Sequence, residues 1–379
     1  MGRYLNPGME SFEKSVNSEI YVDKTGLVGY TNRVMNTVQG YVCVSRPRRF
    51  GKSMAANMLT AYYSRGCDSR EIFSKFEISE SPDFEKYRNK YNTIFLNMQE
   101  FLSRSDSVEA LVDRVKKLVL RDLKREYPDV DYFDDTDLVE SMQDIYETEK
   151  CPFVVIIDEW DCIFREFRQN KEAQEKYLDF LRDLLKDKAC IHLAYMTGIL
   201  PIKKYGTHSA LNMFDEFSMI NPGPLAPYVG FTEVEVEYLC HKYRMDMEEV
   251  KAWYDGYSFS MAASVYSPRS VVNSMLFGKI ENYWNQTETF EALQVYIDMN
   301  FDGLKDDVLS MIAGERIPVN TGSFTNDMTT FRTEDDVLTL LIHLGYLAYD
   351  SENKVVKIPN NEVRNEYAVS YTHLTLPTT

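Results

Sequence analysis

The sequence has no long hydrophobic run. Nowhere in its 379 residues do about 18 consecutive apolar residues occur, the length a helix needs to span a bilayer. The first residues, Met1 to Asn6, lack the apolar core of a signal peptide. Asn6 also stands where N-myristoylation requires Ser or Thr. These absences predict a cytoplasmic protein without a membrane partner.

Metal-binding and disulfide patterns are also missing. Histidine occurs five times, and the six cysteines contain no C-x-x-C pair. Scattered cysteines of this kind fit neither a zinc site nor a disulfide framework. We therefore expect reduced thiols in a reducing compartment. The cysteines are Cys43, Cys67, Cys151, Cys162, Cys190 and Cys240.

Positive charge is in deficit. The chain has 42 Lys and Arg against 59 Asp and Glu, a formal net charge of -17. Broad, non-specific nucleic-acid binding needs a basic surface, so this charge argues against it. The acidic excess favours solubility. A hydrophobic content of 44% excludes a disordered or collagen-like chain, and the length suits two domains.

Short apolar runs alternate with helical patterns through the first part of the chain. The runs are apolar throughout and have the length of strands, which is typical of a parallel sheet covered on both faces. We therefore predict an α/β domain with helices on both faces of its sheet. The predicted strands are 40–45, 93–98, 153–157 and 191–196, and the predicted helices are 54–63, 107–126 and 171–188.

A cluster of prolines and glycine over residues 221–227 predicts a domain boundary near residue 222. The prediction is a core over 1–222 and a mainly helical region over 223–367. Near its end, a helix over 335–343 precedes a hairpin over 346–358, which suits either a winged-helix unit or a plain α+β cap. Further helices are predicted over 232–256, 268–279 and 287–297.

The triplet Gly51-Lys52-Ser53 follows a predicted strand and opens a predicted helix, as a phosphate loop requires. Loop N–H groups and a helix N-terminus favour anions, so Lys52 would reach the β- and γ-phosphates of ATP. Ser53 would ligate Mg²⁺ through its hydroxyl. The full pattern has Gly where this sequence has Arg46, and the triplet alone is a weak signal.

Four cations lie within seven residues at this loop: Arg46, Arg48, Arg49 and Lys52. A solvated basic turn would look the same, but in so acidic a chain the cluster suggests attraction of a triphosphate. Arg46 would replace backbone amides lost with the missing Gly. The predicted ATP-binding residues are Arg46, Pro47, Arg48, Arg49, Phe50, Gly51, Lys52, Ser53 and Met54.

An acidic pair follows the third predicted strand. Asp158 and Glu159 come directly after four apolar residues, at the strand edge where open α/β sheets bind ligands. Asp158 would hold Mg²⁺, and Glu159 would activate the attacking water as a general base. Taken alone, the pair would more often be a solvated acidic turn. Together with the phosphate loop, it predicts a nucleotide site.

The run over 191–196 ends in Thr197, which would sense the γ-phosphate from the same edge and join Lys52 and Glu159 as a catalytic residue. An ordinary threonine at a strand end is the alternative. We predict that this run lies between the phosphate-loop strand and the acidic strand. That order is typical of glutamate-dependent ATPases.

Several motifs together resemble the AAA-ATPase-like family of bacterial and archaeal proteins, over roughly residues 4–367. The form R-P-R-R-F-G-K-S over 46–53 is the family's own phosphate-loop variant, which accounts for Arg46. Asp23 and Lys24 match a family motif to which we assign no role. The other matching segments are 157–161, 196–198, 211–215, 230–233, 253–257, 265–268, 344–347 and 358–363.

The resemblance implies an ATPase core that usually precedes a nuclease-like domain of the PD-(D/E)XK type. After Tyr367 the sequence has no room for that domain, so we expect a truncated product. Residues 368–379 resemble a sequencing adapter translated in frame, and we expect this tail to carry no structure. Any nucleic-acid partner would act through the missing domain.

Two functions follow from these patterns. The first is an Mg-dependent ATPase whose conformational change gates a nuclease-like domain or a partner protein. The second is a nucleotide-occupancy switch of a defence or regulatory system that turns over rarely. The sequence leaves open whether the protein forms a homo-oligomer and whether a second subunit supplies an arginine finger. Asp161 is a candidate for a supporting role beside the site.

Overall fold

The computed structural model describes residues 2–202, 211–259, 262–284, 295–297, 301–325 and 331–375. The chain forms two compact units. The first contains Met1–Ser45 and Lys52–Glu216, and the second contains Arg46–Gly51 and Phe217–Thr379. The observed division after Glu216 lies close to the predicted one near 222. It differs in assigning the loop 46–51 to the second unit, because the side chains of that loop contact residues beyond 216.

A five-stranded sheet forms the centre of the first unit, with the order β2-β3-β4-β1-β5. The four predicted strands are confirmed, and they pair in parallel. As predicted, β4 lies between β1, which leads into the predicted phosphate loop, and β3, which carries the acidic pair. The strands are β1 Tyr41–Ser45, β2 Asn92–Asn97, β3 Phe153–Asp158, β4 Ile191–Gly198 and β5 Asp215–Phe217.

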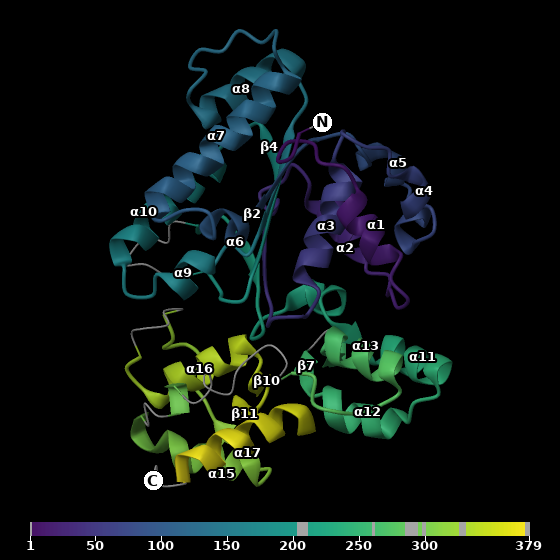
Figure 1. The fold of residues 1–379 in the computed structure, drawn as a ribbon, viewed down its shortest axis with the longest axis vertical. Coiled ribbons are helices and arrows are strands. Elements are labelled where there is room, and N and C mark those ends of the chain that lie inside the picture. The colour runs from purple at the N-terminus through teal and green to yellow at the C-terminus, as the bar shows by residue number, and fades with distance from the viewer. Residues whose placement is uncertain are drawn as a thin grey trace. The chain divides into compact units, whose positions relative to one another are not determined.

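Helices cover both faces of this sheet (Figure 1), as predicted. One face carries α1 Glu10–Val16, α2 Gly26–Val34, α3 Lys52–Tyr63, α4 Arg70–Phe73, the 3-10 turn η1 Glu77–Glu80 and α5 Phe84–Tyr87. The other carries α6 Met98–Leu102, α7 Val108–Glu126, α8 Leu138–Glu149, α9 Cys162–Glu166 and α10 Lys171–Leu185.

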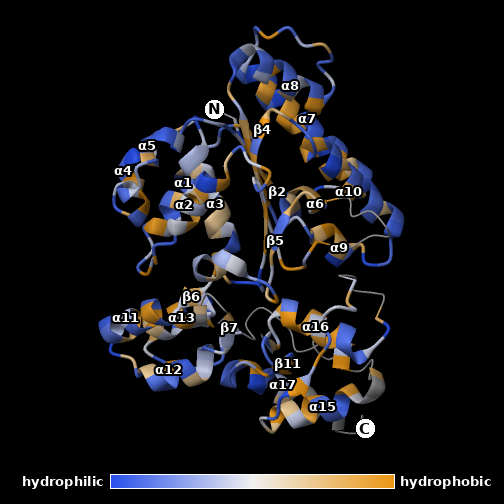
Figure 2. Cartoon of the chain, turned by 180° about the vertical axis from the view of Figure 1, so that it is seen from behind, coloured by the Kyte–Doolittle hydropathy of each residue, from blue (hydrophilic) through white to orange (hydrophobic). Residues whose placement is uncertain are grey.

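Burial on both faces explains why these strands are apolar throughout. Every residue of β3 is buried, including Asp158 at its end. The covering helices are amphipathic: α7 buries Leu111, Val115 and Val119 and exposes charged residues (Figure 2). Removing this apolar surface from water drives the unit to fold. No helix within the described ranges is both long and apolar enough to cross a membrane.

The second unit is mainly helical and has two small sheets, with orders β6-β8-β7 and β10-β11-β9. Its strands are β6 Phe231–Thr232, β7 Tyr257–Phe259, β8 Ala262–Tyr266, β9 Ile317–Pro318, β10 Ala348–Asp350 and β11 Val355–Lys357. Its helical elements are η2 Gly223–Tyr228, α11 Glu233–Tyr243, α12 Met247–Tyr254, α13 Pro268–Phe277, η3 Phe301–Gly303, α15 Leu304–Ile312, α16 Glu334–Leu344 and α17 Asn361–Thr375.

Three details of this unit bear on the predictions. The single helix predicted over 232–256 is two helices, because Arg244 takes a left-handed conformation and Asp246 caps the second helix. The helix and hairpin predicted near the end are confirmed as α16 followed by antiparallel β10 and β11. Most of the helix predicted over 287–297 lies outside the described residues.

The expectation that the tail carries no structure is wrong for residues 368–375. Helix α17 continues through them to Thr375. Once a helix is nucleated, each further residue adds one hydrogen bond, and no breaker interrupts this stretch before Pro377. Residues 376–379 lie outside the described part of the chain.

Candidate functional site

Asp158 lies at the carboxyl end of β3 and is 1% exposed. Its Oδ1 accepts a hydrogen bond from Thr197 Oγ1 at 3.1 Å, because β3 and β4 are in register at these two residues. The Ser53 hydroxyl also hydrogen-bonds this carboxyl group. Oδ2 is buried and has no hydrogen-bond partner within the described residues. Burial raises the pKa of Asp158, and these hydrogen bonds and Lys52 oppose the shift.

A buried carboxylate oxygen without a partner is costly, and a bound cation would relieve that cost. Asp158 and the Ser53 hydroxyl are hard oxygen donors of the kind Mg²⁺ prefers. Within the described residues, no group of three or more His, Cys, Asp or Glu side chains could hold a metal ion. Mg²⁺ at nucleotide sites usually takes one or two carboxylates and completes its shell with phosphate and water. The residues present therefore fit Mg²⁺ bound together with a nucleotide.

Lys52 opens α3 and is 4% exposed. Burial lowers the pKa of its ammonium group, while Glu159, Asp161 and Asp158 raise it. The lysine thus lies in an acidic environment at a helix N-terminus, which is the end that favours anions. Gly51, just before it, has a φ of 90°, a conformation that glycine adopts without strain.

Glu159 follows β3 with a φ of 55°, in the left-handed region that few side chains adopt. Strain of this kind is concentrated at functional sites. Its carboxylate forms an ion pair with Arg165 Nη2. Burial raises the pKa of Glu159, whereas Arg165 and Lys52 lower it.

Arg165 is a residue that the sequence analysis missed. It lies in α9, four residues after Asp161, and its Nε is 3.3 Å from Asp161 Oδ2. The spacing of an acid and a base at i and i+4 was the available signal. Asp161 is fully buried, in keeping with the supporting role considered for it.

The remaining predicted site residues lie in the loop 46–51 and at the start of α3. Arg46 is fully buried: its Nη1 donates to Phe217 O at 2.9 Å, and its guanidinium lies 5.5 Å from the centre of the Phe259 ring. Arg49 Nη1 donates to Tyr283 O at 3.2 Å. All these contacts lie within the second unit, so a role of the arginines at a phosphate stays a prediction.

Three more loop residues are also placed by the structure. The Phe50 ring packs edge-on against Tyr257 with 5.5 Å between ring centres. Pro47 is buried close to Gly345, and Arg48 is exposed. Met54, in α3 of the first unit, is 43% exposed.

Asp23, whose role the sequence left open, joins two elements of the first unit. Its Oδ1 accepts from the Thr25 amide and its Oδ2 from the Glu77 amide, both at 2.8 Å. The carboxylate therefore ties the start of α2 to η1, which is a structural task.

Comparison with known proteins decides the family. Residues 6–207 match the family of predicted AAA-ATPases, more than half of the chain. The chain belongs to this family. The match begins in the first residues and includes Lys52, Asp158, Glu159 and Thr197.

A relative of this chain is the protein of the vnfD 5' region of Azotobacter chroococcum mcd 1. It is 25% identical over 298 residues, which are 74% of this chain and 54% of the relative. The chain therefore spans about half the length of the curated relative it matches.

Two solved structures are similar to this chain at low identity. The Walker-type ATPase paby2304 of Pyrococcus abyssi has a TM-score of 0.45 at 14% identity, covering 91% of this chain and 94% of that one. The ORC2 protein of Aeropyrum pernix has a TM-score of 0.38 at 12% identity, covering 94% and 96%.

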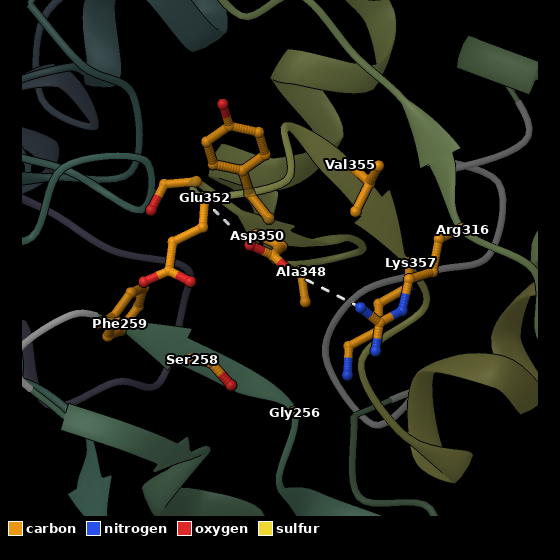
Figure 3. Close-up of a pocket in the computed structure, with 11 residues that line it drawn as sticks. Gly256, Ser258, Phe259, Arg316, Ala348, Asp350, Glu352, Val355 and Lys357 are labelled. Atoms are coloured by element: carbon orange, nitrogen blue, oxygen red, sulfur yellow. Dashed lines mark hydrogen bonds and ion pairs between the residues drawn. The ribbon is translucent and has the colours of Figure 1, made fainter.

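The second unit of the chain contains a cavity of about 370 Å³ between β7 and the β10–β11 hairpin (Figure 3). Charges of both signs line it: Arg316 and Lys357 against Asp350 and Glu352. Arg316 and Asp350 are partners in an ion pair at 3.6 Å. None of the predicted site residues lines this cavity, so it adds nothing to the nucleotide site.

Proposed function

We propose that this protein binds Mg-ATP and hydrolyses it at the end of β3. The observation that carries the proposal is the buried Asp158 carboxylate, whose Oδ2 has no hydrogen-bond partner among the described residues. Lys52 and Ser53 open the neighbouring helix α3, and Thr197 is hydrogen-bonded to the same carboxylate. Cation, phosphate and water ligands thus have donors and acceptors within the first unit.

Each residue has a chemical task in this proposal. Asp158 and Ser53 would hold Mg²⁺, which when bound neutralises charge on the phosphate oxygens. Lys52 would hold the β- and γ-phosphates as a point charge. Glu159 would accept a proton from the water that attacks the γ-phosphorus, while the bond to the ADP oxygen breaks. Thr197 would orient Asp158 and contact the γ-phosphate.

We further propose that nucleotide turnover controls a nuclease-like domain or a partner protein. The division of the chain supports this, because residues 46–51 belong to the second unit while Lys52 and Ser53 belong to the first. A conformational change in the loop 46–51 would then alter the hydrogen bonds that its arginines donate to Phe217 and Tyr283.

Two substitutions separate the proposed tasks. Glu159→Gln keeps the shape of the side chain but removes the base, so we expect Mg-ATP to bind while hydrolysis slows by roughly 10²- to 10⁴-fold. Asp158→Asn weakens the metal site, so we expect both Mg-ATP affinity and turnover to fall. Calorimetry for binding and single-turnover kinetics for hydrolysis distinguish the two, once circular dichroism has established that each variant is folded.

The parent protein supplies the decisive outcome. Hydrolysis by Glu159→Gln at the parent rate would exclude this residue as the base. A parent that retains nucleotide through purification and shows no turnover would favour the occupancy switch over the ATPase. A parent that neither binds nor hydrolyses Mg-ATP would remove the proposal altogether.

A further inference from the structure

The contacts of Arg165 point to a task for it beside the proposed base. We propose that Arg165 is a positioning residue: anchored through Asp161 to the end of β4, its guanidinium fixes the Glu159 carboxylate for activation of water. This inference rests on the proposed function and adds to it the residue that orients the base.

Arg165 binds two carboxylates at once. Nη2 donates a hydrogen bond to Glu159 Oε2, and Nε lies 3.3 Å from Asp161 Oδ2 in an ion pair without hydrogen-bond geometry. The charge of Asp161 attracts the guanidinium and holds it beside β4. The planar fork of the guanidinium then fixes the direction of the donor that binds Glu159. The Arg165 side chain is 9% exposed, and water has little access to compete for it.

Asp161 supplies the fixed end. It is fully buried, and its Oδ2 accepts hydrogen bonds from the amides of Ile199 at 3.0 Å and Leu200 at 2.8 Å. These amides directly follow β4, so the anchor is main chain rather than a mobile side chain. Trp160 adds a second connection, because its amide donates to Thr197 O at 3.0 Å.

Stability alone explains this arrangement poorly. A buried ion pair adds little net stability, because desolvation of both charges offsets their attraction. Glu159 is also one of several non-glycine residues with a left-handed backbone, a conformation that persists only where the surroundings enforce it. With Oε2 held by Arg165, Glu159 presents Oε1 as the acceptor for the proton of water.

The test is a double-mutant cycle on the full chain, with single-turnover hydrolysis and Mg-ATP affinity as readouts. We expect Arg165→Gln to slow hydrolysis by about 10-fold or more, with the dissociation constant of Mg-ATP changed by less than about threefold. Arg165→Lys keeps the charge but loses the fork of donors, so its hydrolysis rate should lie between that of the parent and that of Arg165→Gln. In a Glu159→Gln background, Arg165→Gln should change the rate by less than about twofold, because its target is gone.

The matched control is Arg182→Gln, which removes a half-exposed arginine of the same unit paired with Asp179 at 2.7 Å. It should leave rate and affinity unchanged. If Arg165→Gln does not fold, Arg165→Lys with and without Glu159→Gln gives the same cycle.

Four outcomes would overturn the inference. The first is a parent-like hydrolysis rate in Arg165→Gln, or in Arg165→Lys if only that variant folds. The second is an equal loss of hydrolysis rate with and without Glu159→Gln, and the third is a loss of Mg-ATP affinity in parallel with the loss of rate. The fourth is a parent protein that binds Mg-ATP without hydrolysing it. In the first three, a parent that hydrolyses ATP leaves the proposed function standing. The fourth removes hydrolysis and this inference but leaves nucleotide binding intact.

Discussion

Gly198 ends β4 beside the candidate site, and its replacement by alanine should destabilise the first unit. A Cβ at this position would lie 2.7 Å from Trp160 Cδ1 and 2.8 Å from Asp161 Oδ1. Both neighbours are fully buried, so neither can move into solvent. Overpacking of this kind costs about 1–3 kcal/mol. The lower entropy of the unfolded alanine chain offsets about 0.4–1 kcal/mol of it.

The net expectation is a loss of about 1–2 kcal/mol, or roughly 2–8 °C in melting temperature for a unit of this size. The matched control is Gly29→Ala within helix α2. There a Cβ would meet only Ile78 Cδ1, at 4.0 Å. Alanine is the better helix former, so this variant should gain about 0.5–1 kcal/mol.

Thermal melts and urea titrations of both variants measure the two changes in unfolding free energy, provided that the denaturant dependence of that free energy equals the parent's. Opposite signs for the two substitutions are expected. If Gly198→Ala proves as stable as Gly29→Ala, the close packing of Gly198 against Trp160 and Asp161 is wrong, and with it the anchoring of Asp161.

Three other predictions concern the loop, the lysine and a buried acid. Lys52→Ala should abolish or severely weaken Mg-ATP binding, because the point charge on the phosphates is lost; unchanged affinity by calorimetry in the folded variant would refute the phosphate-loop assignment. Phe50→Ala should destabilise the second unit by about 3–5 kcal/mol, since the ring is 1% exposed and packs on Tyr257, and a melting temperature equal to the parent's would contradict that packing. Burial raises the pKa of Glu362 to about 7, above its ordinary value of 4.5. Between these two values the folded state holds a proton that the unfolded state has released. The stability that this group contributes therefore falls as pH rises from 4.5 to above 7. The unfolding free energy of Glu362→Gln, relative to that of the parent, should therefore rise by about 3 kcal/mol between pH 4.5 and 8. If denaturant titrations show a difference that stays constant with pH, Glu362 does not titrate in this range.

The sequence was sufficient to predict four of the five strands of the first unit's sheet, because burial on both faces requires strands that are apolar throughout. The fifth strand, β5, was missed because it is short and begins with the charged residues Asp215 and Glu216. The order with β4 beside both β1 and β3 followed from motifs at the ends of those strands. The neighbourhood of Asp158 and Thr197 was also predictable, since parallel strands bring their carboxyl ends to one edge.

Other features depend on contacts that no local pattern records. Glu159 has a left-handed backbone conformation and pairs with Arg165, and neither residue type predicts that conformation or that pair. The interruption at Arg244 was missed for a different reason: arginine favours helix, and the local signal of the break, Asp246 as the N-cap of the second helix, was not used.

The contacts of the loop 46–51 have a consequence for how the chain comes to be folded. Arg46 and Phe217 are 171 residues apart in sequence, and Arg49 and Tyr283 are 234 apart. Contacts between distant segments form slowly, because long stretches of chain must be closed into loops first. During synthesis the loop leaves the ribosome early, and its partners emerge only after most of the first unit has been made. We therefore expect a nascent chain to complete its sheet before its phosphate loop reaches its final conformation, so that nucleotide binding is among the last properties it acquires.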